Sequence, residues 1–262
     1  MDYREQHQRG KNAVKAIRYI KYILKTCKKH GKDVTRDMKI LDFGCGSGDA
    51  AYFLVKMGYN AYGYDLYYNL SDCSKKYSER FLFYDNDRNQ TGLVNYAVDL
   101  GNFCLPYDDC SFDIVITSQV FEHIFNHEKV IREFRRVMRD DGISINTFPP
   151  KYVLIDAHIK ILWGQIIKFR PYYFLCALLG IRNEFQKGKS IMCVTNSNYH
   201  YARTGLNYIS TKEFRRIASQ YFSYISIETK QFNDILMKLR KYSFVKFFLE
   251  NCSRNITAVL KP

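Results

Sequence analysis

Apolar positions near the start of the chain recur at helical spacing. The apolar members of this series are Val14, Ile17, Ile20, Leu24 and Cys27. Lysines and arginines between residues 11 and 28 follow the same period on another face. An apolar stripe opposite a basic face is typical of an amphipathic helix. The pattern therefore predicts a basic helical segment over residues 1–37.

After Gly31 the pattern changes to short apolar runs that alternate with helical stretches, which is typical of parallel strands joined by crossover helices. Strands are expected near 38–43, 60–65, 94–98, 112–118 and 142–148. Helices are expected near 48–57, 71–79 and 127–139, the last of them ended by a turn at residues 140–142. Pro149 and Pro150 stop the fifth strand, because proline cannot continue a sheet ladder.

Residues 151–205 interrupt the alternation with an aromatic, basic and apolar segment, which we call the lid. Residues 206–262 then complete the sheet, with strands expected near 223–229 and 255–261. A helix is expected near 211–220, after the lid and before the first of these strands. Ser210 and Glu213 are spaced as a capping box at its start. The expected fold class is α/β, with a seven-stranded, mostly parallel sheet whose core spans residues 38–150 and carries a lid after strand five.

The bulk composition fits a globular protein, since 47% of the 262 residues are hydrophobic and 16% are aromatic. The charged N-terminus lacks the features of a secretory signal, and charges interrupt the apolar stretch 159–181 too often for a membrane span. The eight cysteines form no C-x-x-C pair and are expected to be free thiols. We therefore expect the protein in the cytoplasm.

The net charge of +14 is unevenly distributed along the chain. Residues 1–39 carry +8, residues 40–150 carry −6, and residues 151–262 carry +12. Basic flanks favour an anionic partner, which could be a phosphorylated metabolite, a nucleic acid or an acidic membrane. A solvated basic surface without a partner is the alternative explanation.

The stretch Ile40–Gly48, I-L-D-F-G-C-G-S-G, reads as a strand running into a glycine-rich loop. Glycines at such a turn let the backbone approach a ligand closely, because a Cβ there would collide with it. Asp65 follows twenty-one residues after Gly44, at the end of the next expected strand. A carboxylate at that point can accept hydrogen bonds from both ribose hydroxyls. By themselves these residues fit a dinucleotide as well as other nucleoside cofactors.

A third segment distinguishes between these two classes of cofactor. Residues 97–124 read A-V-D-L-G-N-F-C-L-P-Y-D-D-C-S-F-D-I-V-I-T-S-Q-V-F-E-H-I. With this segment, residues 38–149 resemble the Rossmann-like core of class I S-adenosylmethionine-dependent methyltransferases, in particular the small-molecule branch that includes sugar and surface-polysaccharide enzymes. Dinucleotide dehydrogenases do not share the pattern.

The resemblance implies a set of cofactor-binding residues. Those implied at the methionine part are Asp42, Gly44, Cys45, Gly46 and Gly48; at the ribose, Asp65, with Leu66 beside it as a further cofactor contact; at the adenine, Asp99 and Leu100; and at the end of the fourth strand, Ser118 and Gln119.

Methyl transfer to a hydroxyl benefits from a general base, and the pKa of histidine suits that role. His123, in F-E-H-I after the fourth strand, is the first candidate, because related methyltransferases use a histidine near this point. His158, in the lid segment D-A-H, is the second, with Asp156 as its potential support. Glu122 is a candidate for orienting an imidazole or contacting the substrate. Either histidine could instead have a purely structural role.

On the substrate side, Tyr152 and Arg203 are the candidate contacts, with Lys187 and Lys189 as further candidates for a phosphate. The string F-P-P-K-Y at 148–152 resembles the motif with which amine methyltransferases grip an exocyclic amino group. That motif belongs after strand four, however, and this one follows strand five. No set of carboxylates and histidines has ligand spacing along the chain, so no metal site is predicted.

The sequence thus favours an O-methyltransferase that acts on a small anionic metabolite, such as a nucleotide sugar or a surface-polysaccharide precursor. One alternative is a tRNA methyltransferase, which a basic surface would favour. Another is a quinone or lipid methyltransferase that contacts the membrane through the N-terminal helix and residues 159–181. A cofactor-binding protein without catalytic activity is the remaining alternative.

Overall fold

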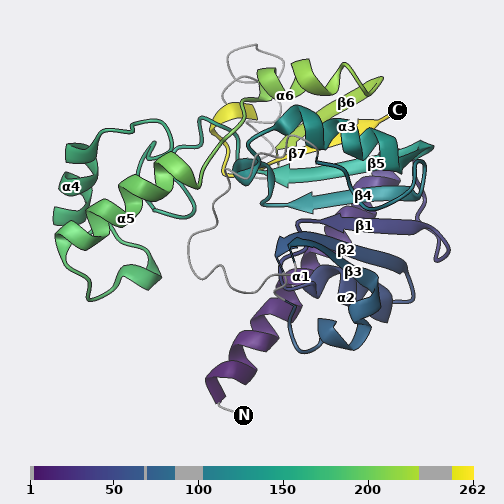
Figure 1. Ribbon diagram of the computed structural model, residues 1–262, viewed down its shortest axis with the longest axis horizontal. Helices are drawn as coiled ribbons and strands as arrows, with labels where there is room; N and C mark the ends of the chain where they lie inside the picture. The colour runs from purple at the N-terminus through teal and green to yellow at the C-terminus, as the bar shows by residue number, and fades with distance from the viewer. Residues whose placement is uncertain (1–2, 68–69, 86–102, 230–249) are drawn as a thin grey trace.

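The computed structural model describes residues 3–67, 70–85, 103–229 and 250–262, and these build one seven-stranded sheet (Figure 1). The strand order is β3-β2-β1-β4-β5-β7-β6. The first five strands of this order are parallel, whereas β7 pairs antiparallel with both β5 and β6. The seven strands are β1 (Lys39–Phe43), β2 (Asn60–Tyr67), β3 (Phe81–Asp85), β4 (Phe112–Ser118), β5 (Met138–Phe148), β6 (Tyr224–Thr229) and β7 (Ile256–Lys261). A mostly parallel seven-stranded α/β sheet was predicted, and this is confirmed.

Helices cover both faces of the sheet. Among the described residues, the helices beside the sheet are α1 (Tyr3–Lys29), α2 (Asp49–Lys56), α3 (His127–Val137) and α6 (Thr211–Ala218), while α4 (Arg170–Leu178) and α5 (Ile191–Thr204) belong to the lid (Figure 1). Because side chains alternate along a strand, Ile40 packs with α1 and α2, whereas Leu41 packs with α3 and α6. The sheet thus lies between two apolar layers. The loops at the ends of its strands are not part of these layers and can carry the residues of a binding site.

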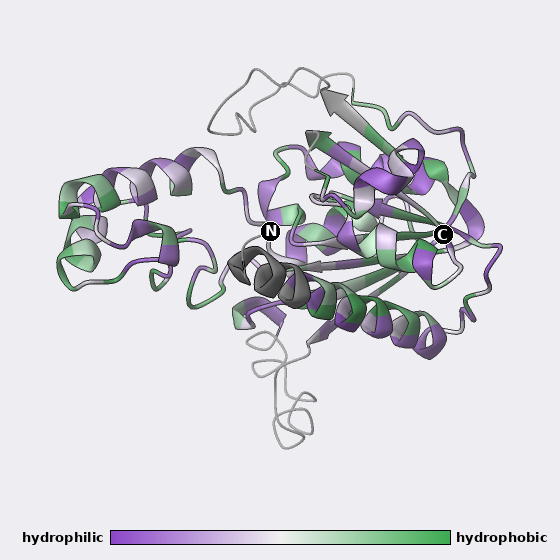
Figure 2. Cartoon of the chain, turned by 90° about the horizontal axis from the view of Figure 1, so that it is seen from below, coloured by the Kyte–Doolittle hydropathy of each residue, from purple (hydrophilic) through white to green (hydrophobic). Residues whose placement is uncertain are grey.

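The N-terminal helix lies across one face of the sheet, with hydrophobic and hydrophilic bands alternating along it (Figure 2). Its buried apolar side chains are Ala16, Ile20, Ile23 and Cys27, which recur at helical spacing. Val14, predicted to lie on the apolar face, is exposed instead. The predicted helix is confirmed, but its buried stripe is turned slightly from the predicted one.

The third strand differs from the prediction. It is formed by Phe81–Asp85 and pairs in parallel with β2, so that Gly63 lies opposite Phe81. The expected strand at 94–98 lies outside the described residues. The helix expected at 71–79 is a 3₁₀ helix, η1 (Ser74–Arg80), which leads directly into β3.

The turn expected at residues 140–142 is also absent. The helix α3 ends at Val137, and β5 begins at Met138 without a turn between them. Met138 pairs with Phe112 and Ile143 pairs with Ile114, so residues 139–142 form a bulge within β5. Arg139 stabilises this bulge, since its guanidinium donates to Asp113 on β4 at 2.9 Å.

The lid stands out from the sheet as two helices, α4 and α5, joined through the 3₁₀ helix η3 (Glu184–Gln186) (Figure 1). It has a small core of its own, made by Ile159, Ile161, Tyr173, Cys176 and Ala202. Tyr173 is fully buried there, so this tyrosine fills the lid's core. After the lid, the Ser210 hydroxyl accepts from the backbone N–H of Glu213 and caps α6, which is one half of the predicted capping box; the Glu213 carboxylate accepts from Arg216 instead.

All eight cysteines are free thiols, as expected from their spacing. Within the described parts of the chain, no helix is both long and apolar enough to cross a bilayer.

Candidate active site

The glycine loop between β1 and α2 takes the backbone conformations that only glycine adopts easily. Gly44, Gly46 and Gly48 have φ values of +72°, +53° and +74°. A Cβ on Gly44 would lie 2.3 Å from a methyl carbon of Val120, and one on Gly48 would lie 2.7 Å from the ring of Phe81. A Cβ on Gly46 would meet nothing within 4 Å. Side chains therefore pack closely against Gly44 and Gly48, whereas the space beside Gly46 is empty.

Asp65, at the end of β2, closes this loop. One oxygen of its carboxylate accepts from the backbone N–H of Gly46 at 2.6 Å, and the other accepts from Leu66 N–H at 2.7 Å. Asp42, on β1, is buried beneath the loop. Burial, reinforced by the charge of Asp65, raises the pKa of Asp42 to about 8. Asp42 therefore keeps its proton below about pH 8, and the carboxylate of Asp65 beside the loop is the group whose charge favours a cationic ligand.

A cavity of about 270 Å³ opens beside the loop. It is lined by Phe43, Gly44, Gly46, Tyr64, Asp65, Leu66, Phe103, Gln119, Val120, His123, Ile124, Phe125 and Val130. The cavity thus gathers residues from the ends of β1, β2 and β4, which meet at the carboxyl edge of the parallel sheet. Ligands of open α/β sheets bind at that edge.

Of the remaining predicted cofactor residues, some do not line this cavity and some lie outside the described residues. Gln119 has a left-handed φ of +59° and donates from its amide to Asn255 at 3.1 Å, while Ser118 is half-buried at the end of β4. Cys45 lies in the loop, where burial raises the pKa of its thiol, but it does not line the cavity. Asp99 and Leu100 lie outside the described residues.

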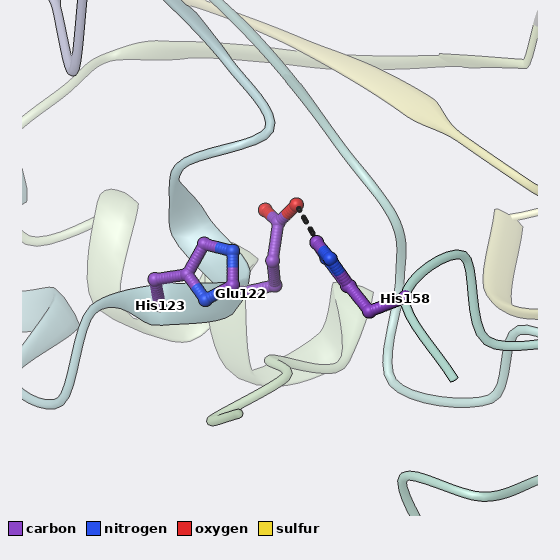
Figure 3. Close-up of side chains that lie close together, drawn as sticks. All are labelled: Glu122, His123 and His158. Atoms are coloured by element: carbon purple, nitrogen blue, oxygen red, sulfur yellow. Dashed lines mark ion pairs between the residues drawn. The ribbon is translucent and has the colours of Figure 1, made fainter. Parts of the chain in front are cut away.

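His123 and His158, the two candidate bases, lie side by side although they are thirty-five residues apart in sequence. Their ring centroids are 5.1 Å apart. His123 belongs to the 3₁₀ helix η2 (Phe121–His123), and its Nδ1 lies 2.9 Å from the backbone oxygen of Gly205 at the end of the lid. His158 approaches from the lid, and its Nε2 lies 3.9 Å from Oε1 of Glu122 (Figure 3).

Asp156 supports His158 through the backbone. Its Oδ1 accepts from the backbone N–H of His158 at 2.7 Å and from that of Ile159 at 2.9 Å. Its Oδ2 accepts from the hydroxyl of Tyr208 at 2.6 Å, and the burial of this pair raises the pKa of Tyr208. Asp156 therefore supports His158, as predicted, but through the backbone of His158 and not through its side chain. The imidazole of His158 faces Glu122 instead.

A second and larger cavity, of about 860 Å³, lies in the lid and includes His158 in its wall. Three basic side chains, Lys160, Arg182 and Lys189, line it together with one acidic side chain, Glu184, so its charged lining is net positive. Asn198 also lines it; this side chain is buried, and its amide nitrogen has no hydrogen-bond partner among the described residues. The lid cavity is thus suited to a polar, negatively charged molecule.

Of the predicted substrate contacts, only Lys189 reaches the lid cavity. Arg203 donates to the hydroxyl of Tyr199 on its own helix, and neither Tyr152 nor Lys187 lines either cavity. Sequence reasoning missed Lys160 and Arg182 as partners of a ligand. They are twenty-two residues apart in irregular segments, so no periodicity links them.

The central part of the chain is similar to known proteins. Residues 41–146 match the family model described as "Methyltransferase domain". The ubiquinone biosynthesis O-methyltransferase of Rickettsia bellii is 28% identical over 126 residues, which cover 48% of this chain and 48% of that protein. The sarcosine/dimethylglycine N-methyltransferase of Halorhodospira halochloris is 32% identical over 116 residues, or 43% of this chain and 38% of the relative. The chain therefore aligns with half or less of the length of these curated relatives.

Among solved structures, phosphoethanolamine N-methyltransferase 2 of Haemonchus contortus, in complex with S-adenosyl-L-methionine, has a TM-score of 0.51 at 15% identity. The alignment covers 90% of this chain and 51% of that one. At this identity the likeness concerns the fold, which is the Rossmann-like methyltransferase fold.

Proposed function

Because residues 41–146 match the family model described as "Methyltransferase domain", we propose that the protein transfers a methyl group from S-adenosylmethionine to a hydroxyl of a small anionic acceptor. The bound cofactor supplies an activated methyl group on a sulfonium cation. Gly44 and Gly46 offer it a backbone surface and Asp65 a carboxylate, while the buried carboxyl of Asp42 lies on β1 next to the loop. The open space at Gly46, which a Cβ would fill, fits a ligand that lies against the loop.

The observation that carries the proposal is the meeting of the two cavities at one pair of side chains. His123 lines the cavity beside the glycine loop, His158 lines the lid cavity, and their rings are in contact. An acceptor held in the lid cavity would therefore present its hydroxyl where the two histidines meet. Alignment of an acceptor with the methyl donor is the main contribution that a protein makes to this reaction.

Proton removal is the second contribution. The hydroxyl loses its proton as the new carbon–oxygen bond forms and the carbon–sulfur bond breaks. Glu122, His123 and His158 lie at this point and can promote that loss, which is typically worth ~10² to 10⁴ in rate.

The class of acceptor follows from the charge of the lid cavity. Lys160, Arg182 and Lys189 can pair with phosphate oxygens, so we expect a hydroxylated metabolite that carries phosphate, with nucleotide sugars as the class to test first. Neither curated relative named above is described as acting on a sugar, so this assignment rests on the cavity alone.

The test uses methyl-labelled S-adenosylmethionine with nucleotide sugars, total tRNA and a membrane extract as separate acceptors. We expect label in the nucleotide-sugar fraction. Replacing Lys160 and Arg182 together by Ala should raise the KM of the acceptor at least ~100-fold without changing cofactor affinity, because the loss of charge-assisted contacts costs roughly 1.5–3 kcal/mol each. Lys187→Ala, outside the cavity, is the matched control. Label in tRNA that ribonuclease removes would refute the proposed acceptor.

One observation favours a second acceptor class. Most exposed large hydrophobic side chains of the described residues lie on the lid, including Phe169, Leu179 and Phe185. Phe185 is 79% exposed and Leu179 is 69% exposed. An apolar surface beside basic side chains suits a membrane interface, and ubiquinone biosynthesis enzymes are among the relatives. Label in the membrane extract, extractable into organic solvent, would support a quinone or lipid acceptor instead.

A further inference from the structure

The side chain of Glu122 is a buried carboxylate in the candidate active site whose burial no hydrogen bond explains. Its side chain is fully buried, and neither carboxylate oxygen has a hydrogen-bond partner among the described residues. Burying a carboxylate without donors is costly, and native proteins rarely leave such a group unsatisfied. The imidazole of His158 faces it: Nε2 of His158 lies 3.9 Å from Oε1 of Glu122 and also lacks a hydrogen-bond partner among the described residues.

The distance between Glu122 and His158 leaves room for an ion. At 3.9 Å the two atoms are too far apart for a hydrogen bond. Two ligands of one zinc ion, each at ~2.0–2.2 Å from the metal, lie roughly 3–3.5 Å apart in a tetrahedral site. A shift of under about 1 Å would therefore bring both atoms into a common coordination sphere, and His158 is partly exposed and able to adjust.

His123 supplies a third ligand in the required tautomer. A backbone carbonyl only accepts hydrogen bonds, so Nδ1 of His123, 2.9 Å from the oxygen of Gly205, carries the proton of the neutral ring. The lone pair is then on Nε2. Histidines that bind metals typically donate their other N–H to a carbonyl or carboxylate in this way.

The three side chains converge on one point. One ligand atom from each of Glu122, His123 and His158 lies within 4.8 Å of the others, and Figure 3 shows the carboxylate between the two imidazoles. The sequence predicted no metal site because it separates His158 from the other two residues by more than thirty positions. The fold brings His158 next to the other two residues in space.

We propose that Glu122, His123 and His158 form a binding site for a divalent transition-metal cation, with Zn²⁺ as the best match. Two imidazoles and one carboxylate are a ligand set of open, catalytic zinc sites, which keep a further position for water or substrate. That open position would lie where the two cavities meet. Asp156, which fixes the backbone of His158, and Gly205, which orients His123, would hold the ligands in place.

The role of the cation rests on the proposed function, although its binding does not. A cation at this point would hold the acceptor oxygen and lower the pKa of its hydroxyl. The histidines would then serve as ligands, and the hydroxyl proton would pass to solvent water. Methyl transfer would in that case require the metal as well as the two histidines.

The test measures metal binding directly. The full-length protein, stripped with a chelator, is titrated with Zn²⁺ alone by calorimetry and with Co²⁺ by visible absorption. We expect one saturable site per chain, with affinity at least ~100-fold weaker in Glu122→Gln and in His158→Ala, in line with the loss of a metal ligand. His200→Ala, which removes a histidine from the same lid, should bind as the original chain does.

The outcomes separate the two proposals. The metal site is refuted if no saturable binding occurs, or if Glu122→Gln and His158→Ala bind Zn²⁺ as tightly as the original chain. Glu122→Gln keeps the shape of the side chain, and a thermal unfolding curve checks that each variant is folded. Zinc binding without methyl transfer to any acceptor would refute the proposed function and leave the metal site standing.

Discussion

Gly44→Ala probes the packing that shapes the candidate cofactor loop. The new Cβ would lie 2.3 Å and 2.9 Å from the two methyl carbons of Val120, and the backbone would keep a φ of +72°. Gly46→Ala is the matched control, because its φ of +53° is also left-handed but its Cβ would meet no atom within 4 Å. The two substitutions thus share a backbone penalty, and only the first adds a collision.

The magnitudes follow from these two contributions. A left-handed conformation costs a residue with a Cβ roughly 1–2 kcal/mol, and overpacking typically costs about 1–3 kcal/mol more. We therefore expect Gly44→Ala to lower the free energy of unfolding by about 2–5 kcal/mol and Gly46→Ala by only ~1–2 kcal/mol. Adding Val120→Ala should recover roughly 1–3 kcal/mol in the first background only, because it removes the colliding methyl groups.

Urea unfolding of the single and double variants measures these differences, and calorimetry with S-adenosylmethionine measures binding. Gly46→Ala should weaken cofactor binding at least ~10-fold while losing less stability than Gly44→Ala, because its methyl group enters the space left for the ligand. Equal destabilisation by Gly44→Ala and Gly46→Ala, or no recovery with Val120→Ala, would refute the steric argument.

Three further outcomes follow from buried and exposed side chains. With a pKa of about 8 in the folded protein, Asp42 retains a proton that the unfolded chain loses above about pH 4, so stability should fall as the pH rises towards 8. Urea unfolding across this range should show the decline, and Asp42→Asn should flatten it. Tyr208→Phe leaves Oδ2 of Asp156 without its buried donor and should cost about 1–3 kcal/mol, measured in the same way, with turnover reduced and cofactor affinity retained. Ser in place of Leu179 or Phe185 should change stability by less than about 0.5 kcal/mol, since both side chains already lie in water; a larger loss in thermal unfolding would mean that they are covered in solution.

Much of the sheet and the cofactor loop could be predicted from the sequence, because both depend on local interactions. Alternation along a strand and the period of a helix are set by residues within a few positions of one another. The glycines of residues 44–48 are likewise required by the backbone turn that they form. The third strand escaped prediction because Phe81–Asp85 follows η1 without a loop, so its apolar run has no boundary that the sequence marks.

The arrangement of polar groups was decided only by the tertiary structure. Glu122 and His123 were recognised as candidates beside the fourth strand, but the partner of Glu122 comes from the lid, and the tautomer of His123 is set by Gly205. Such contacts depend on the path of the lid between residues 151 and 205. That path is fixed by the packing of the lid's own core, which brings together side chains that no local pattern relates.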